Sequence, residues 1–173
     1  WDSGGDHALR RTRWRNFWLV TFLARGVPMI VSGDEYGRTQ NGNNNPWSLN
    51  TVGIWNNWAQ AGSNAPTQVP VDPDQPDLPG YHDVVGATDG AEGVNPLLRF
   101  AAYVAHLRAT QPTFRQRTWG DTQIGGDAVS YVYFGTALND APRPGDRQIA
   151  VAIDSGQTDG DDFWVLLNMY DEP

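Results

Sequence analysis

A short, continuous run of apolar residues, Val27-Pro28-Met29-Ile30-Val31, constrains the fold more than any other feature of the sequence. Runs of this kind are typical of strands that are buried on both faces, as in parallel sheets. A single strand of this type cannot form a sheet, because its backbone needs neighbouring strands as hydrogen-bonding partners. We therefore expect the chain to be a piece of a larger protein that supplies those neighbours.

Helical patterns lie on both sides of the apolar run. Asp6 is suited to cap the first helix, whose apolar residues recur at the helical spacing i, i+3, i+4, i+7 and i+8. These residues are Trp14, Phe17, Trp18, Thr21 and Phe22. Gly26 suits the C′ position that ends this helix. Asn95-Pro96 provides an N-cap and a first-turn proline for a second helix that extends to about Thr110.

The C-terminal third of the sequence changes to a strand pattern. Segments 129–134, 148–153 and 163–168 are rich in β-branched and aromatic residues, and Gly, Pro and Asp separate them. These segments predict an antiparallel sheet. Residues 60–94 are rich in Pro and Gly and show little periodicity, which predicts a long loop or an insertion, with a disordered linker as the alternative.

Composition excludes several classes of function. The chain has no cysteine, which excludes disulfides, thiolate metal sites and cysteine nucleophiles. A net charge of −8 is unfavourable for binding nucleic acid, and no apolar run approaches the roughly 20 residues of a membrane span. The three histidines lack a metal-ligand spacing, and no phosphate-binding glycine motif is present. We therefore expect no cofactor, no metal, no nucleic acid and no membrane partner.

A long motif then relates the sequence to a known family. Residues 26–40, GVPMIVSGDEYGRTQ, followed by Gly42-Asn43-Asn44-Asn45, resemble isoamylase-type glycogen debranching enzymes of the α-amylase superfamily of glycoside hydrolases. The tryptophan-rich segment 55–58 and the helix near 97–111 are similar to later segments of that family, as is 163–170.

The resemblance implies a fold class, an α/β fragment that contains the last helix, strand and helix of a (β/α)8 TIM barrel followed by an incomplete antiparallel β-domain. Residues 27–32 would form the eighth barrel strand. Residues 1–112 would close the catalytic barrel, with an insertion at about 60–94, and residues 113–173 would begin a C-terminal β-sandwich domain.

The resemblance also implies a substrate site, because function in such barrels lies at the C-terminal ends of the strands. The candidate substrate-binding residues that follow the expected strand are Asp34, Glu35, Arg38, Asn43, Asn44 and Asn45. Their expected ligand is a branched α-glucan such as glycogen or amylopectin. Each residue also has a structural alternative: the two carboxylates could satisfy loop amides or pair with an arginine, Arg38 could brace the loop, and the asparagines could form turns.

No catalytic residue is expected in this chain. Retaining glycosidases place two carboxyl groups about 5 Å apart across the scissile bond. Asp34 and Glu35 are adjacent, and neighbours on a strand point to opposite faces. The family's three essential carboxylates follow its fourth, fifth and seventh strands, and all of these would precede Trp1.

The prediction is therefore part of a glycoside hydrolase that cleaves α-1,6 branch linkages of glucans. By itself the chain would be inactive, and its partner would be the missing N-terminal barrel. The alternatives are a stand-alone glucan-binding or interaction module from a decayed debranching gene, or another α-amylase-superfamily specificity. The cytoplasm is the favoured location, although a chain without its own N-terminus cannot show a targeting segment.

Overall fold

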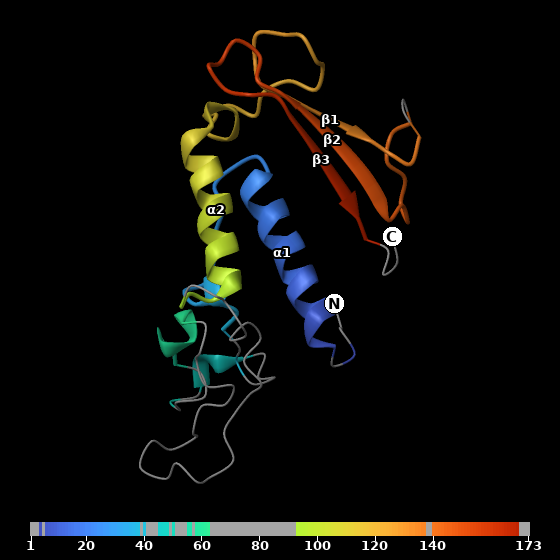
Figure 1. Ribbon diagram of the computed structural model, residues 1–173. Helices are drawn as coiled ribbons and strands as arrows, with labels where there is room; N and C mark the ends of the chain where they lie inside the picture. Colours follow the sequence, from blue (N-terminus) through green and yellow to red (C-terminus); the bar gives the residue numbers. More distant parts are fainter. Residues whose placement is uncertain are drawn as a thin grey trace. The chain divides into compact units, whose positions relative to one another are not determined.

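The computed structural model describes residues 4, 6–38, 40, 45–48, 50, 55–56, 58–62, 93–137 and 140–169. Its elements are α1 (His7–Leu23), α2 (Pro96–Thr110), β1 (Ser130–Phe134), β2 (Gln148–Asp154) and β3 (Phe163–Asn168), with short 3₁₀ turns between them (Figure 1). The chain divides into two compact units. The first contains Trp1–Thr21 and Met29–Ala105, and the second contains Phe22–Pro28 and His106–Pro173.

Both helices begin at the caps that the sequence predicts. The Asp6 carboxylate accepts hydrogen bonds from the amides of Ala8 and Leu9, at 2.8 and 3.0 Å. The Asn95 side-chain oxygen accepts one from the Leu97 amide, at 2.8 Å. Each side chain thus satisfies amides that a helix start leaves without an intrahelical partner. α2 ends at Thr110, as predicted.

The end of α1 differs in detail from the prediction. The helix stops at Leu23, so Gly26 lies beyond the C′ position, although its φ of +93° is in the region that favours glycine. The Arg108 guanidinium donates hydrogen bonds to the carbonyl oxygens of Phe22, Ala24 and Gly26. A cation beside the last carbonyls of a helix is also favoured by the helix dipole. Arg108 therefore closes the end of α1 and the turn that follows it.

The predicted strand over residues 27–32 is wrong for this chain. Residues 27–31 are irregular, and Val27 and Met29 are 94% and 90% exposed. The physical reason is that a strand needs a pairing partner, and no described residue pairs with this run. The α/β character is confirmed, because one helix precedes the run in the sequence, another follows it, and a sheet comes after both. The strand expected between the helices has not formed.

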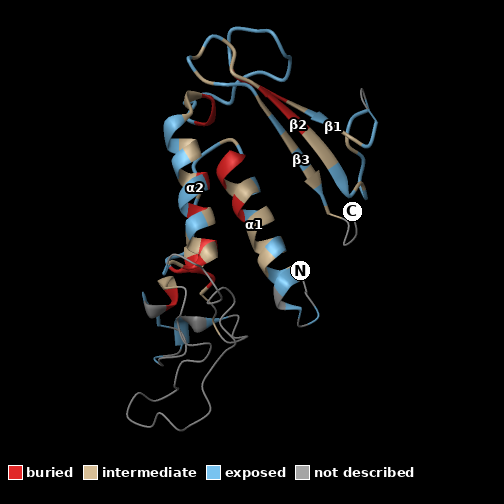
Figure 2. Ribbon diagram, in the orientation of Figure 1, coloured by how far each residue is buried: buried red, intermediate tan, exposed pale blue. Residues whose placement is uncertain are grey.

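The antiparallel sheet forms as predicted. Its order is β1-β2-β3, and in one row Tyr131 lies opposite Ile153, which lies opposite Phe163. Buried residues gather on the start of β1 and the second half of β2 (Figure 2). The Phe114 ring packs against that of Phe163, with centroids 4.6 Å apart. β2 is therefore the central strand and carries most of the buried apolar surface of the sheet.

Some predictions fall where the structure describes little. Residues 63–92 lie outside the described residues, and they include nearly all of the predicted insertion at 60–94. The predicted domain boundary at residue 112 also stays a prediction. Among the described helices, none is both long enough and apolar enough to span a membrane.

Candidate functional site

The segment that follows the apolar run forms a tight loop in the first unit. Asp34–Tyr36 make one 3₁₀ turn between two glycines, and the φ of Gly33 is +101°. The amides of Tyr36 and Arg38 both donate to the Gly33 carbonyl, at 3.2 and 2.9 Å. A Cβ atom on Gly33 would lie 2.5 Å from the side-chain oxygen of Asn56. Glycine is therefore required at residue 33 by both the backbone conformation and the space around it.

The two candidate carboxylates brace this loop. Asp34 Oδ2 accepts a hydrogen bond from the Val31 amide at 3.1 Å, and Glu35 Oε2 accepts one from the Gly33 amide at 2.8 Å. Satisfying loop amides is the structural role that the sequence left open for them. The strand argument about their faces does not apply, because successive residues of a 3₁₀ turn point about 120° apart. The second oxygen of each carboxylate accepts no hydrogen bond within the described part of the chain.

A buried tyrosine anchors the loop to the start of α2. Tyr36 is 1% exposed, and its ring meets that of Trp58 edge-on, with centroids 5.8 Å apart. The fully buried Asn95 donates from its side-chain nitrogen to the carbonyls of Tyr36 and Gln60, at 3.1 and 2.8 Å. Asn95 thus caps α2 and holds the loop at once, and sequence analysis identified only the cap.

Burial and charge also act on the Tyr36 hydroxyl. Burial raises the pKa of Tyr36, and the nearby negative charge of Glu35 raises it further, while Arg38 lowers it. The hydroxyl has no hydrogen-bond partner among the described residues. Tyr36 therefore stays neutral and acts as a packing anchor for the loop.

One open cavity of about 320 Å³ brings two of the predicted site residues together. Asp34 and Arg38 line it, and the aromatic side chains of Trp14, Phe17 and Trp18 line it as well. The rings of Trp14 and Trp18 are stacked at a tilt, with centroids 5.1 Å apart. The cavity therefore combines a carboxylate, a guanidinium and aromatic surface, which is a combination suited to a polyhydroxylated ring compound.

The other predicted site residues do not line this cavity. Glu35 is half-buried beside it and contacts the Gly33 amide. Asn45 is exposed, and Asn43 and Asn44 lie outside the described residues. In the part of the chain that the structure describes, no three His, Asp or Glu side chains are grouped in a way that could hold a metal ion.

Comparisons with known proteins found similarity over part of the chain. Over 58 residues, 34% of this chain, the sequence is 43% identical to a "Glycogen operon protein GlgX homolog" of Mycobacterium bovis. Over 61 residues it is 41% identical to the isoamylase of a Flavobacterium species, and over 63 residues 37% identical to a glycogen debranching enzyme of an Enterobacter species. No protein-family model matches the chain, and no solved structure is significantly similar to it.

The similarity covers a small part of these relatives. The matched stretch is about a third of this chain, but it is only 8% of the Mycobacterium and Flavobacterium proteins and 10% of the Enterobacter enzyme. The predicted resemblance to isoamylase-type debranching enzymes is confirmed for that stretch. The chain is therefore similar to one portion of such enzymes.

Proposed function

We propose that this chain is part of a glycoside hydrolase that cleaves α-1,6 branch linkages in glycogen-like or starch-like glucans. In this proposal the loop after the apolar run forms one wall of the glucan site. The catalytic carboxylates belong to barrel strands that precede Trp1. The chain by itself binds glucan weakly and hydrolyses nothing.

The observation that carries the proposal is the sequence similarity to debranching enzymes. Three relatives from different bacteria carry names for glycogen debranching, isoamylase or the glycogen operon, at 37–43% identity over about 60 residues. These names describe the three relatives and not this chain. Because the similarity is continuous over a third of the chain, we infer the same substrate class here.

The geometry of the loop supports a role in binding. Asp34 and Arg38 line the same cavity as Trp14 and Trp18. A carboxylate oxygen of Asp34 remains available to accept a hydrogen bond from a sugar hydroxyl, and the Arg38 guanidinium can donate to one. Aromatic rings next to such groups suit the apolar faces of glucose units.

The geometry also supports the absence of hydrolysis by the isolated chain. Asp34 and Glu35 each accept a hydrogen bond from an amide of their own loop, and only Asp34 reaches the cavity. Retention requires two carboxyl groups that face one glycosidic bond from opposite sides, about 5 Å apart. Asp34 and Glu35 both bond to amides of the same tight turn, so they do not provide that arrangement.

The test transfers the matched stretch into an active relative. A chimera of the Flavobacterium isoamylase would carry the segment of this chain that contains Arg15, Ile30 and Arg38 in place of its own corresponding segment. We expect it to release reducing ends from amylopectin and glycogen, whereas the 173-residue chain alone releases none. Arg38→Gln in the chimera should lower kcat/KM by at least about tenfold, because a buried or partly buried charged hydrogen bond contributes roughly 1.5–3 kcal/mol.

Arg15→Gln is the matched control. It also removes one arginine charge, but Arg15 lies on α1 and does not line the cavity. Its kcat/KM should stay within about twofold of the unmodified chimera. A soluble, folded chimera without hydrolysis, or equal losses for both variants, would contradict the proposed role. Glycogen binding by the isolated chain with an inactive chimera would favour the alternative of a glucan-binding module.

A further inference from the structure

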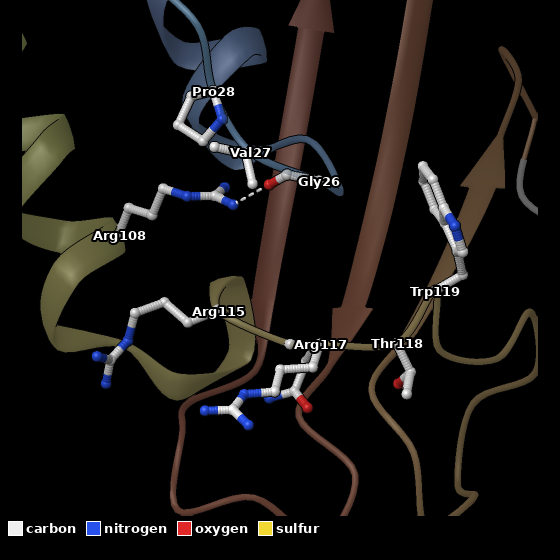
Figure 3. A pocket seen from close by; sticks show the side chains of 9 residues that line it. Gly26, Val27, Pro28, Arg108, Arg115, Arg117, Thr118 and Trp119 are labelled. Carbon is white, nitrogen blue, oxygen red and sulfur yellow. Dashed lines mark hydrogen bonds between the residues drawn. The ribbon is translucent and has the colours of Figure 1, made fainter.

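The second unit has its own cavity, distinct from the loop site of the first. Its volume is about 570 Å³, and it is open to solvent. Three arginines line it, Arg108 at the end of α2 and Arg115 and Arg117 in the segment that follows (Figure 3). Trp119, Val27 and Pro28 provide apolar wall. Pockets of this size are typical of sites for small molecules.

The charge of this cavity is unbalanced. Among the described residues, its lining contains no aspartate or glutamate. The acceptors that the structure describes for the Arg108 guanidinium are uncharged backbone carbonyls, among them that of Gly26, and these do not neutralise its positive charge (Figure 3). The guanidinium groups of Arg115 and Arg117 make no ion pair within the described part of the chain. Three uncompensated cations in one cavity stand out in a chain whose net charge is −8.

Figure 3 shows how the three side chains are arranged. Arg108 reaches toward Gly26, and Arg115 and Arg117 extend to the same side of the segment that carries them. Trp119 stands further along that segment, and it is 73% exposed. The arrangement thus has a cationic part and a separate aromatic part, both on the lining of one cavity.

We propose that this cavity binds a small phosphate monoester on a ring, such as a phosphorylated sugar. The phosphate would be held by Arg115 and Arg117, because a guanidinium group matches the geometry and charge of a phosphate and can donate two parallel hydrogen bonds to it. The long-range field of Arg108 adds to the attraction. The ring would lie against the apolar wall that includes Trp119. A neutral glucan carries no negative charge that could pair with three guanidinium groups. We therefore treat this site as separate from the proposed glucan site.

The test is isothermal titration calorimetry on the full 173-residue chain at low ionic strength. The probes are glucose 6-phosphate, adenosine monophosphate, inorganic phosphate and glucose. We expect saturable binding of at least one ring phosphate, binding of inorganic phosphate at least about tenfold weaker, and none of glucose. The two ring phosphates distinguish a sugar ligand from a nucleotide ligand.

Variants then locate the site. Arg115→Gln and Arg117→Gln should each weaken binding of the ring phosphate about tenfold, since each removes a charge-assisted hydrogen bond. Trp119→Leu should weaken binding of the ring phosphate and leave binding of inorganic phosphate unchanged. Arg143→Gln is the matched control, because it removes one exposed arginine that pairs instead with Asp140. Far-UV circular dichroism of every variant checks that the fold is kept.

Three outcomes would overturn the proposal. One is that neither ring phosphate shows saturable binding. Another is that Arg143→Gln weakens binding as much as the cavity variants do, which would indicate a general charge effect. The third is inorganic phosphate binding as tightly as the ring phosphates, which would mean that the site recognises only an ion. Because the readout is binding, it is independent of whether the chain takes part in glucan hydrolysis.

Discussion

Two short apolar runs of this chain have similar composition and different structures. Residues 149–153, Ile-Ala-Val-Ala-Ile, form most of the central strand β2, and the side chains of Val151, Ala152 and Ile153 are buried. Residues 27–31, Val-Pro-Met-Ile-Val, remain irregular, and their large side chains are exposed. Both runs have the apolar character of a buried strand.

The difference lies in the partners and not in the runs themselves. β2 is paired on both sides, with β1 and with β3, and both neighbours are close to it in sequence. Within the described residues, the hydrogen bonds seen for this run lie at or just before its two ends. Arg108 binds the Gly26 carbonyl before the run, and the Asp34 carboxylate binds the Val31 amide at its end. Apolar composition therefore decides what can be buried, while available backbone partners decide whether a strand forms.

Truncation of an isoleucine to alanine in each run tests this difference directly. Ile153 is 2% exposed and Ile30 is 43% exposed. We expect Ile153→Ala to lower the free energy of unfolding by about 2–4 kcal/mol, because it removes buried methyl groups and leaves a cavity. Ile30→Ala should cost less than about 1 kcal/mol. Urea unfolding followed by far-UV circular dichroism measures both. Equal costs for the two variants would show that the two runs do not differ in how much their side chains contribute to stability.

The same pair sharpens the proposal about the missing barrel. In the chimera described above, neighbouring strands would be present for the run. Ile30→Ala should then cost about 2–4 kcal/mol, as expected for a buried isoleucine. If its cost in the chimera stayed below about 1 kcal/mol, the run would not be a barrel strand.

The next prediction concerns the anchor before the exposed run. Arg108→Met keeps much of the side-chain stem and removes the donors to the carbonyls of Phe22, Ala24 and Gly26. We expect a loss of about 2–3 kcal/mol, since hydrogen bonds from a charged group are stronger than neutral ones. Arg115→Met, whose guanidinium bonds to no described residue, should change stability by less than about 0.5 kcal/mol. The same urea titration compares them, and equal effects would show that Arg108 is not an anchor.

Sequence analysis predicted the locally determined parts of the fold. The caps at Asp6 and Asn95 and the three strands of the sheet all follow from patterns within a few residues of each other. Sequence analysis also stated that an apolar strand at 27–31 needs neighbouring strands, and no described residue pairs with this run. The family resemblance placed a strand at 27–32, and this chain does not form it because the described residues provide no partner.

For the candidate site, the sequence named Asp34 and Arg38, and both line one cavity, while their role in substrate binding stays a prediction. The sequence also offered a structural alternative for the carboxylates, which is to accept hydrogen bonds from loop amides, and the structure shows such bonds. Sequence analysis missed the double role of Asn95, which contacts Tyr36 from 59 residues away. Long-range contacts of this kind leave no periodic signal. An asparagine at an N-cap is the one clue, because its amide nitrogen remains free to donate.

A smaller effect is expected at the far end of the exposed run. Gly33→Ala places a Cβ where the φ is +101° and where Asn56 Oδ1 would be 2.5 Å away. We expect a loss of about 2 kcal/mol from backbone strain and crowding together. Gly26→Ala has a φ of +93° but open space around its Cβ, so its cost should be about 1 kcal/mol. A thermal melt compares them, and a larger loss for Gly26→Ala would contradict the crowding.

A small effect on stability is expected in the turn that connects β2 to β3, within the paired sheet. The Asp162 carboxylate accepts a hydrogen bond from the Ser155 amide at 2.8 Å, and this bond lowers the pKa of Asp162 below its ordinary value. A lowered pKa in the folded state stabilises the fold above the ordinary pKa of an aspartate, and that stabilisation is lost as the pH falls through the folded value. Asp162→Asn should therefore lower the Tm slightly at pH 7, and this deficit should shrink as the pH falls toward 2.5. Asp159→Asn, at an exposed residue of the same turn, serves as the control. A Tm difference that stays constant from pH 7 to pH 2.5 would show that the charge of Asp162 contributes nothing and that only the shape of the side chain matters.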